Sequence, residues 1–358
     1  MNDQANDRAT DDADRRPEQV LARCREVFPS WRDHTVDDYD FDDPKGFSSF
    51  TMGVRARSAT AATVDPAAVL YRQLAGKDNA ILDFEAEREL FLLLGEQEIA
   101  ATCYHYDDDC RIEQFYRGRT LTAEDVFDPD IQRQVAGELF RFHQLAPPPR
   151  VPTTKTFFEL LHERWGPLVR SVLGPRRGEL PADEQALCDD LLALDTSDTI
   201  AKVLRCLPDR PPALCHNDTY HGNVFLRDDG TVKLLDFEFS CLNQPVFDFA
   251  NFFAETTLQH GLDEAPYFRL IPPRFTDDDL ASFLGFYVDR VAAETDEAID
   301  LASLVDETRR AIMASDYMYA MAAIPLALEP IQKIRFIPYA QQRFHRFLDA
   351  WEREFGAE

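Results

Sequence analysis

The sequence predicts an α+β fold with two lobes: a small β-rich N-terminal lobe that carries one key helix, and a large, mainly helical C-terminal lobe. Between residues 47 and 115 the hydrophobic pattern reads strand, strand, helix, strand, strand. Beyond Pro129, segments of helical periodicity dominate. The 358 residues are enough for two hydrophobic cores. We therefore expect an acidic, disordered tail at 1–16, a first lobe at 17–116 and a second at 117–358.

The elements of the first lobe follow from apolar spacing and turn residues. Apolar residues recur at helical spacing after Pro17, so a helix is expected from there to about Pro29. The acidic stretch 33–43 is expected to be a loop. The remaining elements are four strands with one helix in third place, expected at 47–57, 67–74, 83–94, 102–106 and 110–115.

In the second lobe, apolar residues repeat every three or four positions in six segments, and prolines from Pro147 onward end the first of them. These helices are expected at 131–142, 156–173, 182–204, 277–294, 299–324 and 338–355. Two short strands, at 224–226 and 232–235, are expected to flank a turn at Gly230.

The net charge of the chain argues against certain classes of binding partner. A formal net charge of −27 and a pI near 4.6 argue against nucleic acid and anionic membranes, because both would repel the chain. Lysine is rare among the basic residues, and an acidic surface poor in lysine suits high salt, where ions screen self-repulsion. An acidic protein from a GC-rich genome fits the same composition equally well.

Cysteine usage and hydropathy predict a cytoplasmic protein. The seven cysteines form no Cys-x-x-Cys motif and no zinc-finger spacing with histidine, which fits free thiols in a reducing compartment. The first residues lack the basic cluster and apolar core of a signal peptide. The longest apolar stretch, residues 317–328, has 12 residues and is too short to span a bilayer, so no membrane insertion is expected.

Three oxygen-bearing side chains carry the predicted chemistry. Asn223 follows Asp218 by five residues, and Asp236 ends an apolar strand 13 residues later. Phosphoryl transfer to a hydroxyl needs a carboxylate that accepts the proton and oxygen ligands that hold Mg²⁺ on the nucleotide. We predict Asp218 as the general base and Asn223 and Asp236 as Mg²⁺ ligands, with ATP as the donor. Ordinary turns at both aspartates are the structural alternative, because Asp and Asn favour turns.

Protein kinases place a catalytic Asp, an Asn and a metal-binding Asp-Phe-Gly in this same order. Here Glu238 replaces the glycine, which favours a kinase of small molecules over a protein kinase. Glu238 is expected to reach a second ion or to hydrogen-bond the loop. We place Glu238, together with Tyr220, on the acceptor side of the site.

Further residues are predicted to contact the nucleotide. Arg72 ends an apolar strand where kinases usually carry a lysine that pairs the phosphates, and Glu85 on the next helix is expected to hold it. A surface arginine and a solvated glutamate are the alternative. The turn around Gly46 would cover the phosphates, and the end of the small lobe would offer backbone groups to adenine. The residues of these two segments are Ser48, Ser49, Gln114, Phe115 and Tyr116.

Several motifs together resemble the choline/ethanolamine kinases, within the aminoglycoside-phosphotransferase branch of the protein-kinase-like fold. The resemblance covers roughly residues 45–350 and is densest at 215–255. Its motifs are His216-Asn217-Asp218-(x)4-Asn223, Leu235-Asp236-Phe237-Glu238-Phe239-Ser240, Asn243, Phe247-Asp248-Phe249-Ala250-Asn251-Phe252-Phe253-Ala254-Glu255, Ile112 to Leu121, Phe142-His143 and Tyr339-Ala340-Gln341-Gln342-Arg343-Phe344.

This resemblance implies that Asp218 is the base, that Asn223 and Asp236 bind Mg²⁺ and that Arg72 contacts an ATP phosphate. It also implies that Asp248 and Asn251 brace the catalytic loop. Members of the family often dimerise, so a homodimer is one implied assembly. The implied product is a phosphorylated head group for phospholipid biosynthesis.

The resemblance is weaker in the acceptor pocket. Family members commonly surround an ammonium head with aromatic residues, including a Trp-x-x-Trp pair at whose positions Tyr319 and Ala322 stand here. Tyr339 is retained, His260 replaces a tyrosine, and Glu255 is expected to face a cationic acceptor. The predicted acceptor is therefore a small amino alcohol, choline or ethanolamine. An aminoglycoside, a sugar or a thiamine-like alcohol is the alternative, and an inactive kinase-like binding protein is a third reading.

Overall fold

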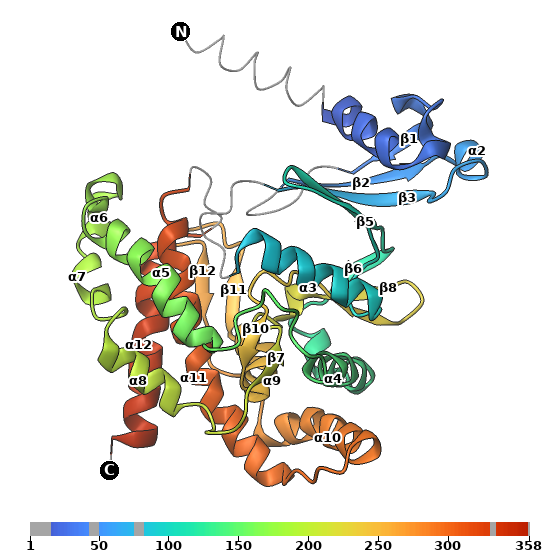
Figure 1. Ribbon diagram of the computed structural model, residues 1–358. Coiled ribbons are helices and arrows are strands. Elements are labelled where there is room, and N and C mark those ends of the chain that lie inside the picture. The colour runs from blue at the N-terminus through green and yellow to red at the C-terminus, as the bar shows by residue number, and fades with distance from the viewer. Residues whose placement is uncertain (1–15, 43–49, 75–81, 330–333, 357–358) are drawn as a thin grey trace. The chain divides into compact units, whose positions relative to one another are not determined.

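The computed structural model describes residues 16–42, 50–74, 82–329 and 334–356. The chain divides into two compact units (Figure 1). Unit 1 comprises residues 1–78 and 91–117, and unit 2 comprises residues 79–90 and 118–358. Residues 79–90 thus group with unit 2, whereas the sequence prediction assigns them to the first lobe. Of the predicted tail at 1–16, only Arg16 is described, and it begins a helix over residues 16–27.

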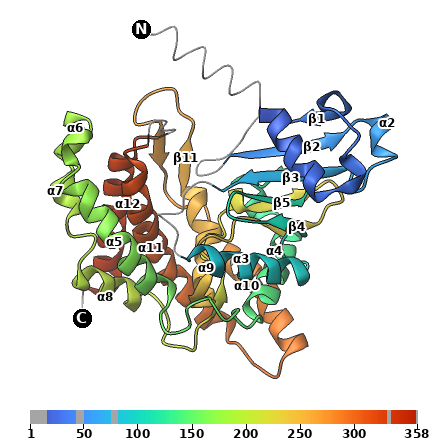
Figure 2. The same cartoon turned by 45° about the horizontal axis from the view of Figure 1, so that its top comes forward.

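Unit 1 is built on one antiparallel sheet. Its five strands are arranged in the order β1-β2-β3-β5-β4. The helix of residues 16–27 lies against this sheet (Figure 2). It buries Val20, Leu21 and Cys24 in a cluster with Val54 and Val69 of the sheet. The strand bounds are Tyr39–Phe41, Thr51–Ala56, Ala68–Gln73, Cys103–Tyr106 and Cys110–Gln114 for β1 to β5. The four strands expected from the sequence are therefore confirmed, and helix α3 (Phe84–Glu96) lies between β3 and β4 in the chain.

The expectation of a loop across residues 33–43 was wrong, because strand β1 lies inside it. Trp31 and Tyr39 are buried and stack with ring centroids 4.4 Å apart. Trp31 Nε1 also donates a hydrogen bond of 3.0 Å to the carbonyl of Pro66. The acidic neighbours point elsewhere, and Asp40 pairs with Arg57 at 3.0 Å. The many acidic residues of this stretch therefore predicted a loop, although Tyr39 is buried against Trp31.

Unit 2 is mainly helical and is organised around α11. This helix (Leu301–Leu326) contacts five others, and α12 lies beside it in both views (Figures 1 and 2). The five are α5 (Phe157–Leu173), α8 (Ser197–Arg205), α9 (Pro245–Ala254), α10 (Asp277–Glu294) and α12 (Phe336–Phe355). Helix α4 (Pro129–His143) packs on α10. These packed helices form the frame on which three small sheets are held.

The small sheets carry the loops of interest. Strand β7 (Ala213–Cys215) pairs with β10 (Cys241–Asn243), and β8 (Val224–Arg227) pairs with β6 (Gly118–Thr120) and with β9 (Val232–Leu234). The hairpin of β8 and β9 confirms the two strands predicted around Gly230. A third sheet pairs β11 (Leu258–His260) with β12 (Phe268–Leu270).

The single helix expected at 182–204 was wrong. The segment breaks into α6 (Ala182–Gln185), α7 (Cys188–Leu191) and α8 (Ser197–Arg205). Thr196 starts α8 as its N-cap, because its side chain accepts a hydrogen bond from the backbone of Thr199. Asp195 just before it turns toward α5, where His162 Nδ1 lies 2.6 Å from its carboxylate. The cap at Thr196 therefore starts a separate helix within the apolar repeat from which a single helix was predicted.

None of the helices within the described residues combines the length and the apolar character needed to cross a bilayer.

Candidate active site

The loop that carries Asp218 is held by one buried carboxylate. Asp248, on α9, is fully buried and accepts hydrogen bonds from the backbone N–H groups of His216 and Asn217 at 2.8 and 2.7 Å. His143 Nε2 donates to the same carboxylate at 3.0 Å. Asn217 has a positive φ of 67°, a conformation that Asn tolerates better than most residues. The implied bracing of the loop by Asp248 is confirmed by these contacts.

Asn223 contacts the predicted base directly. Its Nδ2 donates to Asp218 Oδ2 at 2.7 Å and to the Asp218 backbone carbonyl at 2.9 Å. The amide oxygen of Asn223 is then left for other partners, and a carbonyl oxygen is a ligand that Mg²⁺ accepts. The turn between the two residues is tight, since a Cβ on Gly222 would lie 2.3 Å from the ring of Tyr220.

Asp236 follows strand β9 and adopts a left-handed backbone conformation, with φ at 62°. The preceding residue, Leu235, donates its N–H to the carbonyl of Asn223 at 2.8 Å, which ties the two segments together. Asp236 is close enough that its charge raises the pKa of Asp218. Non-glycine residues in this conformation cost about 1–3 kcal/mol and cluster at functional sites.

Burial sets the electrostatics of Asp218. Loss of solvation raises the pKa of its carboxyl to about 8, and the charges of Asp236 and Glu255 act in the same direction. Hydrogen bonds from Tyr319 and Asn223 oppose this shift. The side chain still keeps part of its surface accessible. Asp218 is therefore a carboxyl of raised basicity that an incoming group can reach.

Tyr220 lies among four carboxylates. Burial raises the pKa of its hydroxyl, and the charges of the four acidic groups add to that shift. The four are Asp218, Asp236, Glu238 and Glu255. The structure therefore brings the acidic residues of the predicted site together in unit 2. Their negative charges favour the binding of cations there.

The residues predicted for the acceptor pocket, Tyr319, Tyr339 and Glu255, meet at a buried arginine. Tyr319 on α11 donates its hydroxyl to Asp218 Oδ1 at 2.7 Å, and its oxygen lies 3.3 Å from Asn251 Oδ1. Arg343 on α12 is fully buried and lies over the ring of Tyr319 at 5.1 Å and over that of Tyr339 at 5.0 Å. Its guanidinium also forms an ion pair with Glu255.

Arg343 is a site residue that the sequence analysis did not assign. It also donates from its guanidinium to Asp316 Oδ1 at 2.8 Å, so two buried carboxylates balance it together with Arg346, which pairs with Asp316. Tyr339 and Arg343 are four residues apart on one helix and therefore share a face. That spacing was the available signal, but the partners on α11 and beyond α9 depend on tertiary packing.

The predicted nucleotide residues lie on unit 1, apart from Glu85. Arg72 on β3 stands opposite Arg111 of β5, and Gln114 at the end of β5 donates its N–H to Thr102 at 2.9 Å. The guanidinium of Arg55 lies 5.3 Å from the ring of Phe115. Tyr116 follows in the chain.

Glu85 lies 3.9 Å from Arg88 on its own helix, in the part of α3 that belongs to unit 2. Because Arg72 falls in the other unit, the pairing of Arg72 with Glu85 stays a prediction. Ser48 and Ser49 lie outside the described residues. The nucleotide-binding roles therefore stay predictions as well.

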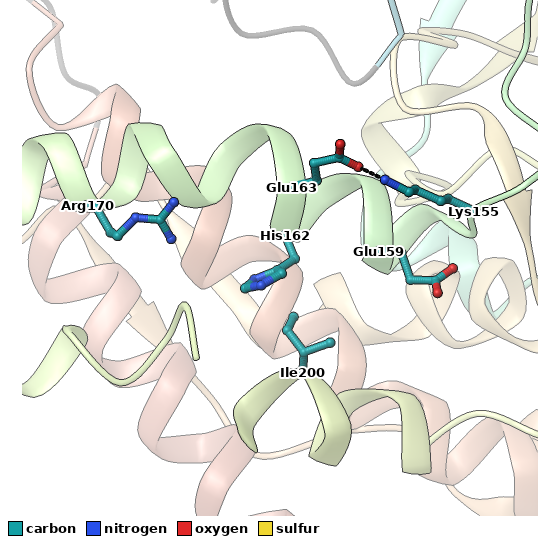
Figure 3. A pocket seen from close by; sticks show the side chains of 6 residues that line it. All are labelled: Lys155, Glu159, His162, Glu163, Arg170 and Ile200. Atoms are coloured by element: carbon teal, nitrogen blue, oxygen red, sulfur yellow. Dashed lines mark hydrogen bonds and ion pairs between the residues drawn. The ribbon is translucent and has the colours of Figure 1, made fainter. Parts of the chain in front are cut away.

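Two other features of the structure share no residue with this constellation. A surface pocket opens along α5 (Figure 3), and none of its lining residues belongs to the predicted site. They are Lys155, Glu159, His162, Glu163, Arg170 and Ile200.

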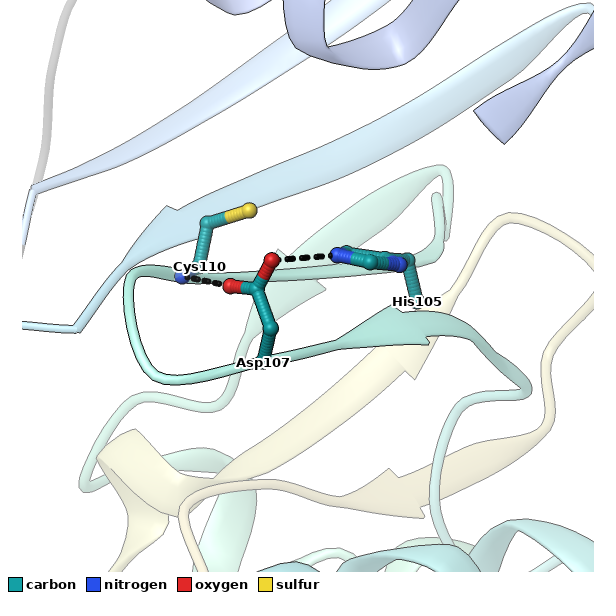
Figure 4. A group of neighbouring side chains, drawn as sticks. All are labelled: His105, Asp107 and Cys110. Carbon is teal, nitrogen blue, oxygen red and sulfur yellow. Dashed lines mark hydrogen bonds and ion pairs between the residues drawn. The ribbon is translucent and has the colours of Figure 1, made fainter. Parts of the chain in front are cut away.

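The second feature is a group of three residues in unit 1 whose side chains can bind metal ions: His105, Asp107 and Cys110 (Figure 4). Asp107 accepts from His105 Nε2 at 2.7 Å and from the Cys110 N–H at 2.9 Å, and it pairs with Arg23. The arginine cation already neutralises this carboxylate, so the group reads as a structural turn.

Asp218, Asn223 and Asp236 lie on a mixed helical and sheet frame, the arrangement predicted for a phosphotransferase of the kinase-like fold. The family model described as choline/ethanolamine kinase matches residues 50–348, and the chain belongs to that family. A choline/ethanolamine kinase of Rattus norvegicus is 25% identical over 286 residues, which cover 76% of this chain and 68% of the relative. An ethanolamine kinase of Drosophila melanogaster is 26% identical over 297 residues, covering 78% and 53%.

Solved structures confirm the predicted fold class. The choline kinase from Cryptosporidium parvum Iowa II has a TM-score of 0.74 at 16% identity and covers 94% of this chain and 95% of its own. The Plasmodium vivax ethanolamine kinase has a TM-score of 0.68 at 21% identity, covering 92% and 88%. The aminoglycoside phosphotransferase APH(2'')-Ib reaches 0.53 at 14% identity, covering 85% and 92%. With the family established, the chain is an ATP-dependent small-molecule kinase.

Proposed function

We propose that this chain transfers the γ-phosphoryl group of ATP, with Mg²⁺, to the hydroxyl of choline or ethanolamine. The observation that carries the proposal is the fixed position of Asp218. Asn223 holds Oδ2 of this carboxylate and Tyr319 holds Oδ1, both at 2.7 Å. The relatives described as choline and ethanolamine kinases support the choice of acceptor.

Asp218 acts on the acceptor hydroxyl. Each carboxylate oxygen accepts more than one hydrogen bond, so Asp218 can receive the acceptor O–H beside the contacts it already makes. The acceptor oxygen forms a bond to the γ-phosphorus while the bond to the β–γ bridging oxygen breaks, and ADP leaves. The hydroxyl proton passes to Asp218. Burial raises the pKa of Asp218 to about 8, which makes its ionised carboxylate a stronger base for this proton.

Asn223 and Asp236 would hold Mg²⁺. One ligand is an amide oxygen and the other a carboxylate, both hard oxygen donors of the kind the ion prefers. When bound, Mg²⁺ supplies neutralisation of the charge that develops on the phosphate oxygens. Glu238, which also lies near Tyr220, would serve a second ion or the loop.

The nucleotide would be held by unit 1. We propose Arg72 for the phosphates, with Glu85 as its partner, and Gln114, Phe115 and Tyr116 for adenine. Ser48 and Ser49 would belong to the turn that covers the phosphates. We also propose a cytoplasmic location, which the free cysteines support, and a homodimer as the assembly.

Removal of the metal should stop the reaction. We expect EDTA to abolish ADP release and added Mg²⁺ to restore it. Asp236→Ala should lower kcat/KM by at least about 100-fold and raise the Mg²⁺ concentration needed for half-maximal rate, because one hard ligand is lost. Asp228→Ala, which removes an exposed carboxylate from the turn of the same hairpin, is the matched control. Equal Mg²⁺ dependence in both variants would remove Asp236 from the metal site.

A panel of alcohols tests the acceptor. ADP release with ATP and Mg²⁺ is measured for choline, ethanolamine, an aminoglycoside, a sugar and thiamine, each at low and at high salt. We expect turnover with choline or ethanolamine. Turnover confined to one of the other alcohols would replace the acceptor but keep the reaction. Mg²⁺-dependent ATP binding with no ADP from any alcohol would contradict the enzymatic role.

A further inference from the structure

Tyr319 touches the base through its hydroxyl rather than offering a ring face to the acceptor. The hydroxyl has one proton, which it donates in the hydrogen bond of 2.7 Å to Asp218 Oδ1. The lone pairs of the tyrosine oxygen are then left as hydrogen-bond acceptors next to the reacting centre. Tyr319 keeps part of its surface accessible, so an incoming ligand can reach this residue.

The rings of Tyr319 and Tyr339 already face a cation of the protein. Arg343 lies 5.1 Å from the ring centre of Tyr319 and 5.0 Å from that of Tyr339, within the range of cation–π attraction. Tyr339 is 4% exposed, and the ring of Phe268 packs edge-on against it at 5.3 Å. A second cation placed on these rings would meet the charge of Arg343.

Burial and two carboxylate partners hold Arg343 in place. The guanidinium is fully buried, pairs with Glu255 and donates to Asp316 at 2.8 Å. Both carboxylates are themselves almost fully buried, so displacing the guanidinium would leave unpaired charges in the interior. The cation–π interaction with both rings is therefore a permanent part of unit 2.

Oxygen atoms of Asp218, Tyr319 and Glu238 are candidate partners for an acceptor cation. Both acidic groups are close enough to Tyr220 to raise the pKa of its hydroxyl. A primary ammonium has three N–H donors that can use such oxygens. A trimethylammonium has none and depends on ring faces and on charge alone.

We propose that Tyr319 sets the acceptor specificity of this kinase, directing the site to amino alcohols whose ammonium carries N–H donors. This inference rests on the proposed function and deepens it. Each methyl group on the acceptor nitrogen removes one donor and adds bulk beside the tyrosine oxygen. The catalytic efficiency therefore falls with every methylation step, and ethanolamine is preferred to choline.

The first test is a methylation series on the wild-type chain. We measure kcat/KM for ethanolamine, N-methylethanolamine, N,N-dimethylethanolamine and choline with saturating ATP and Mg²⁺. The expected result is a stepwise fall that reaches about tenfold or more between the two ends. A choline value equal to or above that of ethanolamine overturns the inference while leaving the proposed reaction in place. Absence of turnover with all four acceptors overturns the proposed function and the inference with it.

The second test separates specificity from orientation of the base. Tyr319→Phe removes the oxygen and keeps the ring, so the ratio of kcat/KM for ethanolamine to that for choline should fall about tenfold. If Tyr319 only orients Asp218, both acceptors lose rate equally, because both use the same base, and an unchanged ratio overturns the inference.

Tyr317→Phe is the matched control on the same helix. The Tyr317 hydroxyl is buried and has no hydrogen-bond partner among the described residues. This variant should keep both the rate and the acceptor ratio of the wild type. A shift of the ratio equal to that of Tyr319→Phe would assign the effect to repacking of α11 and overturn the inference.

Discussion

Replacing Asp218 by alanine is expected to lower kcat by about 10²–10⁴-fold with either amino alcohol, the range that a positioned general base contributes. Burial raises the pKa of this carboxyl, and two hydrogen bonds of 2.7 Å fix its position. The measurement is steady-state ADP release, together with thermal unfolding of the variant. Because burial disfavours the charged carboxylate, its removal should leave the melting temperature unchanged or raise it.

Asp218→Asn is the companion variant. It keeps the size of the side chain and an oxygen for the Tyr319 hydroxyl, but it cannot accept the acceptor proton at neutral pH. Both variants should therefore be equally slow while retaining Mg²⁺-dependent ATP binding. More than about a tenth of the wild-type kcat in either variant would show that general-base catalysis at this position is not needed.

Asp248→Ala is expected to cause the largest loss of stability in unit 2, about 3–5 kcal/mol in the free energy of unfolding. Its carboxylate is fully buried, accepts two loop N–H groups at 2.8 and 2.7 Å and pairs with His143 at 3.0 Å. Without it, the N–H groups of His216 and Asn217 are left without this acceptor inside the protein. Urea unfolding of the full chain measures the loss.

The exposed Asp289 on α10 provides the control for this comparison. Asp289→Ala should change the free energy of unfolding by less than about 0.5 kcal/mol, as surface substitutions usually do. Asp248→Ala should also lower kcat, because the loop that presents Asp218 loses its support. A loss of stability below about 1 kcal/mol would mean that the loop holds its conformation without Asp248.

Elements marked by clear periodicity and capping were predictable from the sequence. Helix α10 was expected over its whole observed length, and Thr276 caps it through the backbone of Asp279. Strand β1 was not predicted, because acidic neighbours surround Tyr39 in the sequence. The break before α8 was not predicted either, because apolar residues continue across Thr196. In both places a single side chain, Tyr39 or Thr196, determined the local structure against the composition of its neighbours.

The active-site residues divide in the same way. The spacing of Asp218, Asn223 and Asp236 was readable because they lie on two short connected segments of a hairpin and its loop. The contact of Tyr319 with Asp218 spans 101 residues and depends on how α11 packs against the loop. The position of Arg343 between two tyrosines likewise follows from the packing of α12 on α11. No local pattern specifies such contacts.

Identification of the reaction product shows whether this chain phosphorylates an amino alcohol and whether Asp218 is needed. The wild-type chain is incubated with ATP, Mg²⁺ and ethanolamine or choline, and phosphorus NMR follows the mixture. We predict a new phosphomonoester of the amino alcohol in equal amount to ADP, formed at least about 100-fold more slowly with Asp218→Ala. Release of inorganic phosphate in place of that ester, or formation of the ester by Asp218→Ala at the wild-type rate, would contradict this prediction.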